Sequence, residues 1–179
     1  RQMCIRDSLN VQLPMWIAAG DEDKHDWARL RLAQARAAIA LQPGGLAILL
    51  DCGEFDNIHP TDKRTPGERL CDVALRVVYG MDAPESPRAL GKYTQGDTLV
   101  VTLSAPVLRR ETGELLLEIA GEDGAYHPVQ SVTLDGTEMR LRSVAVLHPA
   151  KVRYAYVNWG KVSLFGRNGL PLAPFALEG

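Results

Sequence analysis

The segment 51–60 concentrates the side chains most able to do chemistry. It reads Asp-Cys-Gly-Glu-Phe-Asp-Asn-Ile-His-Pro and holds three carboxylates and one histidine. Asp56 and His59 are three positions apart, so a tight turn can bring the carboxylate to one imidazole nitrogen. The carboxylate then fixes the tautomer of His59 and leaves the second nitrogen to act as a general base. Asp56 and His59 are therefore the candidate catalytic pair.

An isolated Asp-x-x-His-Pro is a weak pattern, and it has a structural alternative. In that alternative the loop is solvated, Asp56 caps a turn and His59 contacts the backbone. The position of the loop favours catalysis, because it directly follows the apolar run Leu46–Leu50. In open α/β sheets, functional groups collect beyond the carboxyl ends of the strands.

The elements before residue 80 alternate between strand and helix. Alternating apolar residues predict a strand over Leu9–Met15, and the unbroken run Leu46–Leu50 predicts a strand buried on both faces, as in a parallel sheet. Apolar stripes at helical spacing predict helices over Asp26–Leu41 and Pro66–Tyr79. This order is typical of an α/β domain with right-handed crossovers.

Residues with capping chemistry stand at both predicted helix starts. Asp26 can cap the first helix. Thr65 and Glu68 have the spacing of a capping box, with Pro66 at the first helical position of the second helix. These residues predict where the two helices begin.

Helical periodicity ends near residue 80, and an all-β pattern follows a linker marked by Pro84 and Pro87. Asp135-Gly136 is a tight hairpin signal, and we expect a small sandwich-like module. Six short strands are predicted at regular spacing: Thr98–Ser104, Glu114–Ala120, Val129–Leu134, Thr137–Val146, Lys151–Asn158 and Val162–Phe165. The predicted organisation is an α/β part over 9–80 and a β module over 81–179. Residues 1–8 have neither periodicity and resemble a translated adapter tail, so we expect them to be foreign to the fold.

Composition narrows the range of functions. The 179 residues carry a formal net charge of −2, which gives no electrostatic reason to expect a nucleic acid or anionic membrane partner. No apolar run approaches the roughly 18 residues of a membrane-spanning helix. The three cysteines and four histidines form no metal-binding motif, so we expect no metal and no cofactor. A disulfide between Cys52 and Cys71 remains an open alternative.

Nearly the whole chain, from Asn10 to Phe175, resembles the carboxyl-terminal block of the sialate O-acetylesterase family of SGNH (GDSL-type) hydrolases. The match is carried by the order of several modest motifs rather than by one strong one. The motifs are Val11-Gln12-Leu13, Trp27-Ala28-Arg29-Leu30-Arg31, Asp51-x-Gly53, Asp56-Asn57-Ile58-His59-Pro60, Arg69-Leu70, Tyr79-Gly80, Val152-Arg153-Tyr154-Ala155-Tyr156 and Gly169-Leu170-Pro171.

The resemblance implies a serine esterase that removes O-acetyl groups from sugars and is secreted or periplasmic. It implies an α/β fold, the carboxyl-terminal part of an SGNH-type parallel-sheet domain, followed by the sandwich-like module. In this family an Asp and a His complete the serine triad, and these correspond to Asp56 and His59. The implied partner is an O-acetylated sugar substrate, and the mechanism needs no cofactor.

The sequence departs from the family at the nucleophile. The Gly-Asp-Ser block and the Gly and Asn blocks that supply oxyanion donors are absent. Ser8, within Arg6-Asp7-Ser8-Leu9, lacks the preceding glycine and lies only 56 − 8 = 48 residues before Asp56. We therefore expect a carboxyl-terminal fragment that lacks the amino-terminal part of its own domain and is inactive alone. Two alternatives remain: a non-catalytic sugar-binding or structural module, and an acetylesterase acting on plant polysaccharide.

Several other side chains have both a functional and a structural interpretation. Arg31 and Lys63 can contact a substrate carboxylate, although charged residues on helices and loops are usually solvated. Aromatic residues that can stack on a sugar ring are more often core anchors. We favour the core for Trp27 and exposure for Trp159. The four aromatic candidates are Trp16, Trp27, Tyr156 and Trp159.

Overall fold

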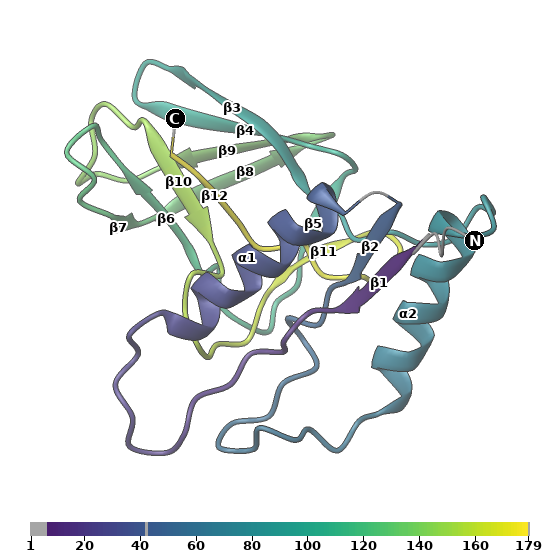
Figure 1. Cartoon of the computed structure of the whole chain (residues 1–179). Helices are drawn as coiled ribbons and strands as arrows, with labels where there is room; N and C mark the ends of the chain where they lie inside the picture. The colour runs from purple at the N-terminus through teal and green to yellow at the C-terminus, as the bar shows by residue number, and fades with distance from the viewer. Residues whose placement is uncertain (1–6, 42, 179) are drawn as a thin grey trace.

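The computed structural model describes residues 7–41 and 43–178, and it has an α/β part and a β module (Figure 1). In the α/β part, β1 (Ser8–Val11) and β2 (Gly44–Ala47) form a parallel pair, with Asn10 opposite Leu46. Helix α1 (Asp26–Ala40) connects these strands, and α2 (Arg64–Val77) follows β2. The parallel pairing and both helices agree with the sequence prediction.

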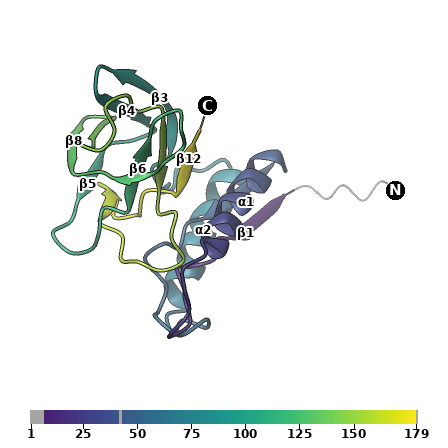
Figure 2. The same ribbon diagram turned by 90° about the vertical axis from the view of Figure 1, so that its left-hand side faces the viewer.

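A glycine in β2 sets how closely α2 packs on the β1–β2 pair. A Cβ on Gly45 of β2 would lie 2.3 Å from a methyl group of Val73, so the glycine lets α2 approach the strand closely. On the other side, α1 lies between the β1–β2 pair and the β module (Figure 1). Figure 2 shows the β module entirely to one side of the helices.

The β module contains two four-stranded antiparallel sheets and a short two-stranded one. The sheet orders are β12-β10-β6-β7, β3-β4-β9-β8 and β11-β5. Asp135 pairs with Glu138 across the β8–β9 hairpin, and Gly136 in its turn has a φ of 56°, which glycine adopts without steric cost. The strands are β3 (Ala89–Gln95), β4 (Thr98–Leu103), β5 (Val107–Arg109), β6 (Leu117–Ala120), β7 (His127–Pro128), β8 (Ser131–Asp135), β9 (Glu138–Arg142), β10 (Lys151–Tyr154), β11 (Leu164–Gly166) and β12 (Phe175–Leu177).

One hydrophobic core runs through both parts of the chain. The inner faces of both four-stranded sheets contribute to it, with residues such as Val101, Met139 and Val152 fully buried. Met15 and Leu50 of the α/β part belong to the same cluster. The two parts predicted from sequence therefore share buried apolar surface.

Some element boundaries differ from the prediction. The run 46–50 begins as β2 but leaves the strand after Ala47, and its remaining residues are a buried, non-strand segment. Ser8 opens β1 instead of ending a foreign tail, while residues 1–6 lie outside the described part. The sequence pattern missed β3, because Gly91 and a register irregularity interrupt its alternation, and it also missed the very short β5, β7 and β12.

Neither helix is capped as predicted. Asp26 is the first residue of α1, and His25 occupies the N-cap with a φ of 60° and no side-chain cap bond. At α2, Asp62 Oδ1 accepts hydrogen bonds from the N–H groups of Arg64 and Thr65, both at 3.0 Å. The carboxylate of Glu68 instead pairs with Arg64 at 2.6 Å, so the capping box does not form.

Candidate functional site

The loop 51–60 follows β2 on the same side of the molecule as the loop 12–25 that follows β1 (Figure 1). Parallel strands direct their following loops to one edge of the sheet, so this placement agrees with the expected position. Gly53 allows the two loops to touch, because a Cβ there would lie 1.9 Å from the carbonyl oxygen of Met15.

Asp51 and Glu54 hold the loop together. The carboxylate of Asp51 forms two hydrogen bonds with the guanidinium of Arg69, at 2.6 and 2.8 Å, which ties the loop to α2. Glu54 accepts from Thr61 N at 2.7 Å and from Asn57 Nδ2 at 2.6 Å. Hydrogen bonds from Thr61, and then from Asn57, lower the pKa of Glu54. The carboxylates of Asp51 and Glu54 thus stabilise the conformation of the loop.

The structure does not bring Asp56 and His59 into contact. Asp56 has a φ of 57°, its Oδ1 accepts the N–H of Ala19 at 2.8 Å, and its own N–H donates to Ile17 O at 3.1 Å. The N–H of His59 donates to Asn57 Oδ1 at 3.0 Å, and the residue is exposed. Within the described chain, no hydrogen bond or ion pair joins the two side chains. Asp56 joins the two loops instead.

Asn158 of the β module organises the loop that leads into α1. Its Oδ1 accepts the N–H of Trp27 at 2.9 Å and of Ala28 at 3.4 Å, which satisfies donors at the start of the helix. Its N–H donates to Asp23 Oδ2 at 2.7 Å, and its carbonyl accepts the N–H of Trp16 at 2.8 Å. One side chain from the module therefore provides the cap that Asp26 was predicted to provide.

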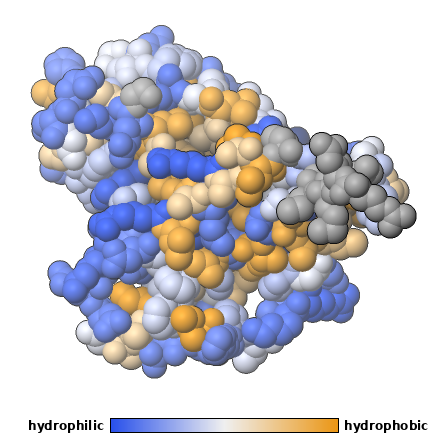
Figure 3. Space-filling model, in the orientation of Figure 1, coloured by the Kyte–Doolittle hydropathy of each residue, from blue (hydrophilic) through white to orange (hydrophobic). Residues whose placement is uncertain are grey.

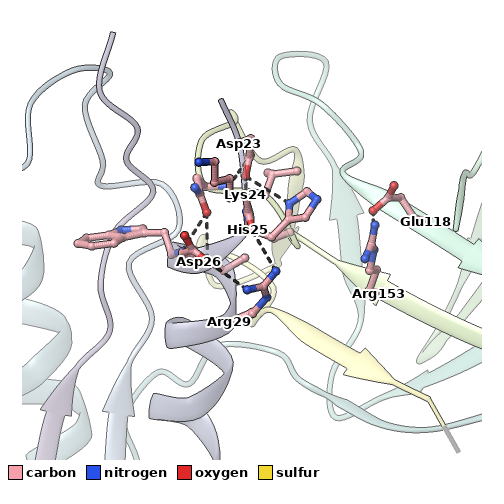
Figure 4. A network of polar contacts seen from close by, with 12 residues as sticks. Asp23, Lys24, His25, Asp26, Arg29, Glu118 and Arg153 are labelled. Carbon is pink, nitrogen blue, oxygen red and sulfur yellow. Dashed lines mark hydrogen bonds and ion pairs between the residues drawn. The ribbon is translucent and has the colours of Figure 1, made fainter. Parts of the chain in front are cut away.

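A carboxylate–imidazole pair that the sequence analysis did not predict, Asp23 and His25, lies in this region (Figure 4). His25 Nδ1 is 3.2 Å from Asp23 Oδ1, and the His25 ring packs against Tyr156 with centroids 5.4 Å apart. Tyr156 also lies under the guanidinium of Arg153, 4.6 Å away, and Arg153 pairs with Glu118 at 2.7 Å. An Asp-x-His spacing was the only sequence signal for this pair. Asp23 also accepts from two backbone N–H groups, so its chemistry here is that of a loop anchor.

Two hollows flank the loops. We call the first the junction cleft; it has a volume of about 270 Å³ and is lined by residues that include Asp51, Gly53, Arg110, Trp159 and Lys161. We call the second the tryptophan groove. It has a volume of about 390 Å³ and its lining includes Trp16, Asp21, Glu22, Asp26, Trp27 and Asn158. Neither Asp56 nor His59 lines either hollow.

Other candidates from the sequence have structural roles. Arg31 is fully buried and donates to the carbonyls of Ala155 and Val157, which ties α1 to the module; burial lowers its pKa to about 10. It is therefore not available to a substrate carboxylate. Lys63 is exposed at the N-cap of α2. Trp159 is half-buried, with its ring 5.8 Å from that of Phe55.

The two cysteines in the described part of the chain, Cys52 and Cys71, are free thiols. Cys52 is buried and Cys71 is exposed, so the open alternative of a disulfide between them is wrong. Within residues 7–41 and 43–178, no group of three or more His, Cys, Asp or Glu side chains is arranged to hold a metal ion. In the same part of the chain, no helix is both long and apolar enough to span a bilayer.

Among the comparisons with known proteins, matches are found with solved structures. No protein-family model matches the chain, and no curated protein sequence does. The fold is similar to a crystal structure described as a novel carbohydrate acetylesterase from Xanthomonas citri, with a TM-score of 0.83 and 32% sequence identity. The similarity covers 93% of this chain and 40% of that one, so the chain spans less than half the length of the enzyme it resembles.

Proposed function

We propose that this chain forms part of a carbohydrate acetylesterase of the SGNH type. The observation that carries the proposal is the 93% coverage of this chain by a carbohydrate acetylesterase at 32% identity. A sequence identity of 32% supports a closer relationship than a shared fold alone would. The parallel β1–β2 pair, with both following loops at one edge, supports the same assignment.

In the proposed mechanism, Asp56 and His59 supply the orienting carboxylate and the general base. His59 accepts the proton of a serine hydroxyl as the serine oxygen attacks the acetyl carbonyl carbon. The sugar alkoxide leaves with that proton, and an acetyl-enzyme remains. Water then attacks the acetyl group with His59 again accepting a proton, and acetate and the free serine are released. Ala19 holds Asp56 Oδ1; we expect Oδ2 to accept the Nδ1–H of His59 in the assembled site.

We further propose that the nucleophile and the oxyanion donors lie outside these 179 residues. Among the described residues β1 pairs only with β2, and an isolated two-stranded parallel sheet is unusual because parallel sheets are normally covered and extended. Apolar side chains gather over α1 and β1 (Figure 3), where Leu30 and Val11 are exposed. Both features suit a sheet that continues on the β1 edge.

A chimera tests the proposal. Residues 9–178 replace the matching region of the Xanthomonas citri enzyme, and acetate release is measured on acetylated xylan and on O-acetylated sialic acid. We expect activity in the chimera and a loss of about 100-fold or more in His59→Ala and Asp56→Ala. His148→Ala is the matched control, since His148 also precedes a proline and is exposed.

The folded state of each chimera is checked by thermal denaturation. A folded chimera that is inactive, or one that keeps its activity in His59→Ala, contradicts the proposed roles. The 179-residue chain alone is expected to release no acetate. Robust turnover by this chain that depends on His59 would show that the nucleophile lies within it.

A further inference from the structure

The tryptophan groove has the composition of a sugar-binding site and lies beside the candidate catalytic loop. Trp16 and Trp27 line it with rings 5.3 Å apart and tilted by 56°. Indole rings offer broad apolar faces, which suit the C–H faces of a pyranose. The volume of about 390 Å³ falls within the range of small-molecule sites.

The polar groups of the groove match sugar hydroxyls. Asp21 and Glu22 are exposed, and neither carboxylate has a hydrogen-bond partner in the described chain. Ionised carboxylates accept strong hydrogen bonds from hydroxyl groups. Asn158 uses its Oδ1 to cap α1, and no described group accepts from its Nδ2, which is left to donate. The lining thus offers acceptors and a donor around an aromatic surface.

The charge of the lining selects against anionic sugars. Asp21, Glu22 and Asp26 contribute three formal negative charges and Lys24 one positive charge, so the sum is 1 − 3 = −2. Arg29 pairs with Asp26 at 3.0 Å but does not line the groove. This net negative charge disfavours a carboxylate-bearing sugar such as sialic acid but not a neutral sugar.

The groove is held in shape by long-range contacts. The backbone N–H of Trp16 donates to the carbonyl oxygen of Asn158, and the indole Nε1–H of Trp27 donates to Pro14 O at 2.7 Å. Such preorganisation lowers the entropic cost of binding. Ile17 lines the groove and accepts the backbone N–H of Asp56, so the groove adjoins the catalytic loop directly.

We infer that the tryptophan groove binds a neutral glycosyl residue of the acetylated substrate. Its link to catalysis rests on the proposed function, whereas sugar binding itself does not. The assignment favours a neutral polysaccharide over a sialylated glycan as the substrate class.

Nuclear magnetic resonance of the 179-residue chain tests the inference. The chain has three tryptophans, so it gives three indole N–H signals that single Trp→Phe variants assign. The neutral probes are cellohexaose, xylohexaose and mannohexaose, and the anionic probes are hexagalacturonate and N-acetylneuraminic acid. We expect saturable shifts of the Trp16 and Trp27 signals with at least one neutral probe, and an affinity for the anionic probes at least about tenfold weaker.

Single substitutions test which side chains of the groove are responsible for the binding and for its charge preference. Trp16→Ala is expected to weaken neutral binding by at least about tenfold, and Trp159→Ala in the junction cleft to leave it unchanged. Glu22→Lys is expected to strengthen binding of hexagalacturonate, while Asp82→Lys, an equivalent charge change in the exposed linker, is not. Glu22 is exposed, so this variant remains informative even if Trp16→Ala fails to fold.

Three outcomes would overturn the inference. These are no shift with any neutral probe up to about 10 mM, a shift confined to Trp159, and equal affinity for neutral and anionic probes. His59→Ala must bind the neutral probe like the wild type. If the esterase assay fails while the neutral probe still binds, only the proposed function is contradicted. If the neutral probe does not bind while esterase activity is present, only this inference is contradicted.

Discussion

Each acidic side chain of the 51–60 loop accepts hydrogen bonds from a different part of the chain. Arg69 of α2 donates to Asp51. Asn57 of the loop and Thr61 directly after it donate to Glu54, and Ala19 of the neighbouring loop donates to Asp56. The sequence shows which chemical groups are present and roughly where, but not these partners. Three of the four partners are backbone N–H groups or lie at least 18 positions away, and such partners leave no pattern in local spacing.

Burial separates the two described cysteines in reactivity. Desolvation, followed by the charge of Asp51, raises the pKa of Cys52 to about 12, far above the usual value near 8.5. Because the thiolate is the reactive form, we expect iodoacetamide at pH 8 to label Cys71 at least about 100-fold faster than Cys52. Peptide mass mapping of the folded and the urea-unfolded chain measures both rates.

The urea-unfolded chain is the control, since both thiols are then solvated and should label at similar rates. The sign follows from the raised pKa: the thiolate fraction of folded Cys52 stays small until the pH nears 12. If Cys52 in the folded chain is labelled at pH 8 as fast as Cys71, then its thiol is accessible to solvent and its pKa is not raised.

At the scale of elements, apolar periodicity located both helices and most of the longer strands. It did not locate the caps, because a cap depends on which residue the tertiary fold brings to the helix end. Asn158 is 131 positions from Trp27 and still accepts its N–H. Short edge strands such as β7, which comprises His127 and Pro128 alone, are too brief to show any period.

Asn158 should be a stabilising residue for α1. Asn158→Ala removes the acceptor for the first-turn N–H groups, and we expect it to lower the free energy of unfolding by about 1 kcal/mol or more. Asn158→Asp keeps an acceptor at the same place and should cost less. Urea denaturation followed by circular dichroism gives both values. Equal losses in the two variants would mean that the cap bond is not what Asn158 contributes.

Asp62 should make α2 sensitive to acid. Hydrogen bonds from Thr65 lower the folded pKa of Asp62 below its ordinary value, so its stabilising contribution is present above the unfolded pKa and is lost as the pH falls through the folded one. The wild-type urea midpoint should therefore fall more steeply between pH 5 and pH 2 than that of Asp62→Asn. Parallel curves for the two proteins would rule out this role for Asp62.

Thr65→Ala, at the predicted cap, should lower the urea midpoint less than Asp62→Ala.

At the scale of the whole molecule, the sequence predicted two neighbouring parts but not how closely they join. The change from helical to β periodicity near residue 80 is a local feature that the sequence pattern shows. The joining contacts are not: Arg31 has the appearance of a solvated helix residue, yet it is fully buried and bonds to the carbonyls of Ala155 and Val157. Likewise, nothing in the spacing of Met15 shows that it packs into the core of a module that begins more than 60 residues later.

The shared core predicts that the two parts unfold together. Met15 is 1% exposed and belongs by sequence to the α/β part but by packing to the common cluster. Met15→Ala should therefore lower the stability of the whole chain by about 2–5 kcal/mol and shift a single calorimetric transition to lower temperature. Met81→Ala is the matched control, because Met81 is 56% exposed and should change little. Two resolved transitions in the wild type, or a variant in which only one of two transitions moves, would contradict this prediction. Either result would mean that the β module folds on its own and does not share a cooperative core with the loops 12–25 and 51–60.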